Sequence, residues 1–127
     1  MVENSLVAED IDAAGRLVTF LDEHGLAVRG ALWLYDSDAE RWRFVIAFQE
    51  TRKDVTSFYL DVAKATSKGD RDDLLDLSRV DIVDPERSIF TALKGVLAVA
   101  GNSRVRFSKN RINGVYLEDA LIYRLSA

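Results

Sequence analysis

The sequence predicts an α+β fold, with a five-stranded mixed sheet and three helices in the order α-β-β-α-β-α-β-β. Three observations support this prediction. Apolar residues recur at helical spacing over residues 6–24, two β-type runs flank a polar turn at residues 37–40, and Asn113-Gly114 separates two further β-type runs. A chain of 127 residues can bury a sufficient core without disulfides, so we expect residues 1–127 to form a single α+β domain.

The first helix is predicted from about Leu6 to His24. One apolar stripe marks it, formed by Val7, Ile11, Ala14, Leu17, Val18 and Leu21. Gly25 should end this helix, because glycine adopts the left-handed conformation of a helix terminus without strain. His24 lies where the helix dipole favours a cation, so we expect its role to be structural.

The first hairpin is predicted to consist of strands Val28–Tyr35 and Arg41–Phe48. A four-residue turn between them sets the register, and the expected pairs are Asp36–Arg41, Tyr35–Trp42, Trp33–Phe44 and Ala31–Ile46. This register stacks four aromatic side chains on one face, whereas aliphatic side chains occupy the other. Because both faces are apolar, we expect something to cover each of them.

The second helix is predicted to begin at Val55. Thr51 and Asp54 precede it in an arrangement close to a capping box, in which side chains accept hydrogen bonds from the first backbone amides of the helix. Gly69 should end it.

Shorter elements follow the second helix. A strand is expected at about Val80–Val83, after a further β-type segment at Leu74–Leu77. The third helix should begin at Asp84-Pro85, an acidic cap followed by the residue best suited to the first helical position, and should end at Gly101. Right-handed crossovers through the second and third helices would make part of the sheet parallel.

Asn113-Gly114 predicts a second hairpin, because both residues tolerate the positive φ of a two-residue turn. Its strands are expected at about Arg104–Ile112 and Val115–Leu125. The register then places Ser108 opposite Asp119 and Lys109 opposite Glu118, and the second pair should form an ion pair.

The candidate nucleic-acid or anion-binding residues are Arg104, Arg106, Lys109 and Arg111. They could clamp phosphate oxygens, and a β-ribbon can enter a groove of a nucleic acid. Strand alternation, however, directs Arg104 and Arg106 to one face and Lys109 and Arg111 to the other. Only a bulge or a longer, twisted loop would bring all four together.

The composition excludes several kinds of site. The chain has no cysteine and one histidine, which excludes thiol catalysis, cysteine-bound zinc and multi-histidine metal sites within one chain. The acidic residues of Asp36–Glu40 lack the companion residues of a calcium loop, and basic residues accompany Asp70–Asp76. We therefore expect no metal, no cofactor and no catalytic residue.

The net charge of −4 disfavours general binding to nucleic acids. The opening residues lack the basic start and apolar run of a secretory signal, and no apolar run is long enough to span a membrane. The expected location is the cytoplasm, with no membrane partner.

We interpret the chain as a non-enzymatic binding module that self-associates as a homodimer, or binds another protein, through an apolar sheet face. The interface candidates are Trp33, Tyr35, Trp42 and Phe44. If the helices divide between both faces of the sheet, this reason for association disappears. Two alternatives stay open. One is nucleic-acid binding by the basic hairpin, and the other is a small-molecule-binding protein or small enzyme with a pocket lined by Trp33, Trp42 and Tyr59.

Overall fold

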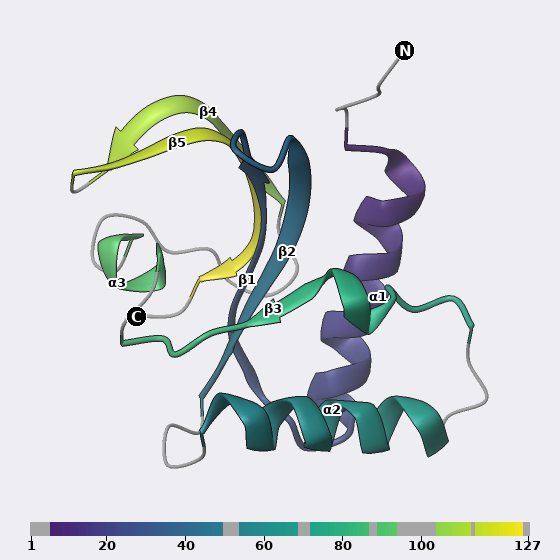
Figure 1. Cartoon of the computed structure of the whole chain (residues 1–127). Helices are drawn as coiled ribbons and strands as arrows, with labels where there is room; N and C mark the ends of the chain where they lie inside the picture. The colour runs from purple at the N-terminus through teal and green to yellow at the C-terminus, as the bar shows by residue number, and fades with distance from the viewer. Residues whose placement is uncertain are drawn as a thin grey trace.

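The computed structural model describes residues 6–49, 54–68, 72–86, 89–93, 104–112 and 114–125, and it has the predicted α+β architecture (Figure 1). Its elements are α1 (Ala8–Glu23), β1 (Val28–Asp36), β2 (Arg41–Phe48), α2 (Val55–Lys68), a 3-10 turn (Leu77–Arg79), β3 (Val80–Ile82), α3 (Ile89–Leu93), β4 (Val105–Ile112) and β5 (Val115–Leu125). The five strands form one mixed sheet in the order β3-β2-β1-β5-β4.

The first hairpin has the predicted register. Trp33 pairs with Phe44 and Tyr35 with Trp42, as the four-residue turn requires. Asp36 holds this turn, because its Oδ1 accepts hydrogen bonds from the backbone amides of Asp38 and Ala39 at 3.0 and 3.2 Å. Short-range turn chemistry therefore fixes the alignment of β1 and β2.

The predicted helix starts and ends are confirmed in part. Gly25 follows α1 with a φ of +80°, the left-handed conformation expected of it. Asp54 caps α2, since its Oδ1 accepts a hydrogen bond from the Ser57 amide at 2.9 Å. The predicted box gave this capping position to Thr51, which, like the predicted stop at Gly69, lies outside the described residues.

Crossovers explain only one parallel pair. β3 runs parallel to β2, as the crossover through α2 predicted. β4 lies at the opposite edge of the sheet from β3 and pairs antiparallel with β5. The second expected parallel pair, through the third helix, is therefore wrong.

Two predictions between α2 and α3 are also wrong. Leu74–Leu77 forms no strand: Asp76 accepts a hydrogen bond from the Ser78 amide at 2.9 Å and begins the 3-10 turn instead. The third helix begins at Ile89 rather than at Pro85, because Asp84 accepts from the Glu86 amide at 2.8 Å and closes a turn there. Its predicted end at Gly101 lies outside the described residues.

Helices α1 and α2 cover one face of the sheet. Side chains of α1, including Leu17 and Leu21, pack on Trp33 and Tyr123 in the first core cluster. The Trp33 Nε1 donates to the Tyr123 hydroxyl at 3.1 Å, and this hydroxyl donates to the Ile11 carbonyl of α1 at 2.5 Å. This buried chain of hydrogen bonds ties the helix to two strands.

Helix α3 covers the other face. Phe90 and Leu93 pack with Leu32 and Ile122 in the second core cluster, and the β4–β5 ribbon curves over the same helix (Figure 1). The helices thus divide between the two faces. A sheet face left wholly bare, the reason given for expecting self-association, is not found among the described residues.

Candidate functional site

Two successive aromatic pairs on the same face of the first hairpin differ in burial. Trp33 and Phe44 are both 0% exposed and lie inside the first core cluster. Trp42 packs against the edge of that cluster, and Tyr35 and Trp42 both stay partly exposed. Of the four interface candidates, Trp33 and Phe44 therefore offer no surface to a partner of the folded chain, whereas Tyr35 and Trp42 do.

Strand β4 adds a basic residue to this exposed pair. The Arg106 guanidinium lies 5.4 Å from the centre of the Trp42 ring, and Tyr35 meets Trp42 edge-on at 5.5 Å. Arg106 also forms two hydrogen bonds of 2.6 Å with Asp119, and Ser108 donates to the same carboxylate at 2.9 Å. We name these five residues, Tyr35, Trp42, Arg106, Ser108 and Asp119, the open corner.

The electrostatics of the open corner follow from these contacts. Hydrogen bonds from Arg106 lower the pKa of Asp119, and the same contact raises the pKa of Arg106. Partial burial raises the pKa of Tyr35, and the nearby carboxylates of Glu40 and Glu118 raise it further. The corner thus holds a neutralised Arg–Asp pair and two aromatic rings, with further acids around them.

The basic residues do not alternate as predicted. Val105, Phe107 and Ile112 all pack in the second core, although the last two are five residues apart. The alternation breaks at Lys109, which has a φ of +52°. This break turns Arg111 to the side of β4 that carries Arg104 and Arg106, as a bulge in the strand would.

A matching irregularity occurs on β5. Leu117 and Ala120 both pack in the second core, so Glu118 and Asp119 between them both lie outside it. Ser108 pairs with Asp119, as predicted, but no ion pair joins Lys109 to Glu118. The predicted ion pair is absent because Lys109 leaves extended geometry at that position.

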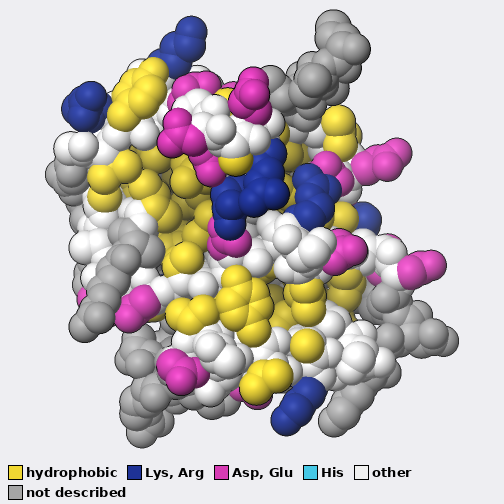
Figure 2. Space-filling view, in the orientation of Figure 1, with side chains coloured by type: hydrophobic (Ala, Val, Ile, Leu, Met, Phe, Trp, Pro, Cys, Tyr) yellow, Lys and Arg dark blue, Asp and Glu magenta, His cyan; other side chains and the backbone are white. Residues whose placement is uncertain are grey.

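The remaining basic candidates have separate partners. Arg104 pairs with Asp12 of α1 at 3.1 Å and lies 5.5 Å from the centre of the Tyr123 ring. Arg111 donates to the Gly114 carbonyl at 3.3 Å and lies over Tyr116. The centre of the face seen in Figure 2 likewise shows basic side chains lying beside acidic ones. The four candidates therefore do not form one basic patch.

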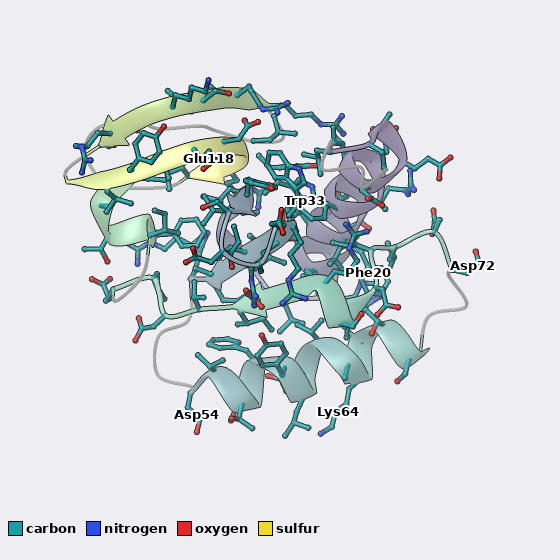
Figure 3. The ribbon with its side chains drawn as sticks, turned by 45° about the horizontal axis from the view of Figure 1, so that its top comes forward. Phe20, Trp33, Asp54, Lys64, Asp72 and Glu118 are labelled. Carbon is teal, nitrogen blue, oxygen red and sulfur yellow. The ribbon has the colours of Figure 1, made fainter. Side chains whose placement is uncertain are left out.

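The aromatic-lined pocket is not assembled as predicted. Trp33 is fully buried, as Figure 3 shows by its place between the sheet and α1. Tyr59 is engaged with the backbone of β3: its hydroxyl donates to the Val80 carbonyl at 3.2 Å and accepts from the Ile82 amide at 2.9 Å. Trp33 therefore offers no surface to a ligand, whereas Trp42 and Tyr59 both stay partly exposed.

His24 makes local contacts. Its ring stacks on Phe20 at 4.0 Å, and its Nδ1 lies 2.8 Å from the Phe20 carbonyl. Within the described part of the chain, no three His, Cys, Asp or Glu side chains are grouped so as to hold a metal ion.

Comparisons with known proteins found no matching family model, no matching curated protein and no matching solved structure. Among the described residues, no helix has the length and apolar character needed to cross a membrane.

Proposed function

We propose that the chain is a non-enzymatic binding module that forms a two-fold dimer through the open corner. The observation that carries this proposal is the contrast between two neighbouring aromatic pairs. Trp33 and Phe44 are sealed in the core, while Tyr35 and Trp42 remain partly exposed beside Arg106. A cytoplasmic location is part of the proposal.

The residue types of the corner support protein binding. Trp, Tyr and Arg are the side chains most enriched among residues that dominate binding energy at interfaces. Asp119 also holds Arg106 in place through two hydrogen bonds, so less side-chain freedom is lost when a partner packs on it. Two partly exposed aromatic rings beside one fixed guanidinium are suited to contact with another protein.

The charges of the corner support a second copy as that partner. A two-fold interface places the same surface on both chains, so it must be complementary to itself. The corner holds the Arg106–Asp119 ion pair, and the charges of Glu40 and Glu118 act on Tyr35. A two-fold rotation can therefore set the Arg106–Asp119 pair of one chain head to tail against the same pair of the other.

Light scattering behind gel filtration tests this proposal across a concentration series. The expected mass of the parent chain rises towards that of two chains, while Trp42→Ala stays at one chain. Leu60→Ala is the matched control, because Leu60 is exposed on α2, away from the corner, and should dimerise like the parent. A parent chain that stays single, or a Trp42→Ala variant that dimerises equally well, overturns the proposal.

A further inference from the structure

The far end of the second hairpin extends beyond the rest of the sheet. β1 pairs with β5 only from Ala120 to Leu125, so residues 115–119 of β5 pair with β4 alone. We name the outer part of this two-stranded region, residues 109–112 and 114–117, the distal arm (Figure 1). Its inner side is fixed, because Ile112, Val115 and Leu117 pack in the second core above α3.

The outer side of the distal arm is polar and basic. The break in alternation at Lys109 leaves Arg111 exposed, opposite Tyr116 on β5. Tyr116 is 52% exposed, and Arg111 lies 5.9 Å from the centre of its ring. An exposed aromatic ring and the Arg111 guanidinium are thus held together on a two-stranded support, and exposed Lys109 lies two residues away on the same strand.

The distal arm and the base of the hairpin differ in how their basic residues are compensated. At the base, Asp12 and Asp119 compensate Arg104 and Arg106. Between Phe107 and Leu117 the sequence has two basic residues and no acidic one. No acidic side chain of the described residues forms an ion pair with Lys109 or Arg111, so both charges are available to a ligand.

We infer that the outer side of the distal arm binds single-stranded nucleic acid. Lys109 and Arg111 contact phosphates of the backbone, and the ring of Tyr116 stacks with a base. Base stacking on one exposed ring reads no sequence, so the binding is sequence-independent. Glu118 lies two residues from Tyr116 and repels phosphates, which confines the contact to the tip.

The test is fluorescence anisotropy with a labelled single-stranded oligonucleotide, an oligothymidylate or an oligouridylate, at low and at moderate salt. The parent chain should bind more weakly as salt rises, and Arg111→Glu should bind at least about tenfold more weakly at low salt. Lys64→Glu is the matched control, since it makes the same change in charge on α2, at the far end of the view in Figure 3 from Glu118. It should bind like the parent.

A second pair of variants tests stacking. Tyr116→Ala should lose about fivefold or more in affinity, whereas Tyr116→Phe should keep it, because phenylalanine preserves the ring. Circular dichroism confirms that each variant is folded. The inference fails if the parent shows no salt-dependent binding, if Arg111→Glu and Lys64→Glu bind alike, or if only duplex is bound. Trp42→Ala leaves the arm intact and should bind normally, so this result is separate from the dimer proposal.

Discussion

The two hairpins of this molecule obey the same pairing rules but differ in how their side chains are distributed. Both have the strand register that their turns predict. Near the turn of the first hairpin, Trp33 and Tyr35 share a face with their partners, as alternation requires, and the register shifts at its far end, between Val28 and Gly30. Along the second hairpin alternation breaks at Lys109, and the break determines where Arg111 and Glu118 lie. A turn sets which residues pair, whereas packing of the whole sheet sets which way they face.

The largest expected effect concerns the first hairpin. Trp33→Ala should lower the free energy of unfolding by about 3–5 kcal/mol, because it leaves a cavity in the core and removes the hydrogen bond to Tyr123. Trp42→Ala should lower it by only about 1 kcal/mol, since that ring is already partly in water. Denaturant unfolding of both variants measures the contrast. Equal losses in the free energy of unfolding would contradict the assignment of Trp33 to the core and Trp42 to the surface.

Gly30→Ala should be the next most disruptive change. A Cβ at Gly30 would lie 2.6 Å from the Phe90 ring of α3, closer than side chains approach one another. The expected loss is about 1–3 kcal/mol in the free energy of unfolding. Combining Gly30→Ala with Phe90→Leu should recover part of that loss in the same unfolding experiment. If the loss in the double variant equals the sum of the two single losses, Phe90 of α3 does not pack against Gly30.

Lys109→Gly should stabilise the second hairpin by about 1 kcal/mol. The φ of +52° at Lys109 strains any residue that has a Cβ, and glycine removes the strain. Arg111→Gly is the control on the same strand, where extended geometry makes glycine unfavourable by about 0.5–1 kcal/mol. Thermal melts of both variants should move in opposite directions. If Lys109→Gly destabilises the chain, residue 109 is in extended geometry, and the side chains of β4 alternate without a break.

The smallest expected effect is the pH dependence of the Arg106–Asp119 pair. Because the folded pKa of Asp119 is lowered, its contribution to stability is present above the unfolded pKa of about 3.9 and is lost as pH falls through the folded pKa. The pair is half-exposed, so this contribution is under about 1 kcal/mol. The free energy of unfolding should therefore fall more between neutral and acidic pH for the parent chain than for Asp119→Asn. Identical pH profiles for the two proteins would show that the Arg106–Asp119 pair does not contribute to stability.

The sequence predicted the elements better than the sites. Turn signals such as Asn113-Gly114 act over a few residues, so strand pairs and their registers could be derived locally. The third helix was misplaced because Asp84 closes a turn instead of capping a helix. The burial of Trp33 and the exposure of Trp42 depend on where α1 ends against the sheet, which no local pattern encodes.

The open corner also contains a residue that sequence reasoning assigned only to cross-strand pairing. Asp119 was expected opposite Ser108, and its bond to Arg106 was not anticipated. Arg106 and Trp42 were predicted for different functions, and they meet although β1 and β5 lie between their strands in the sheet. Contacts between strands that are not neighbours depend on the order and curvature of the whole sheet, which local patterns do not give.

Fluorescence quenching of Trp42 shows whether the open corner becomes covered when two chains associate. In a Trp33→Phe variant, Trp42 is the only tryptophan, so a neutral quencher reports on the open corner alone. If the corner is where two chains meet, quenching should be efficient in dilute solution and should fall as the protein is concentrated. Quenching that is the same at every concentration, in a variant shown to be folded, would contradict the claim.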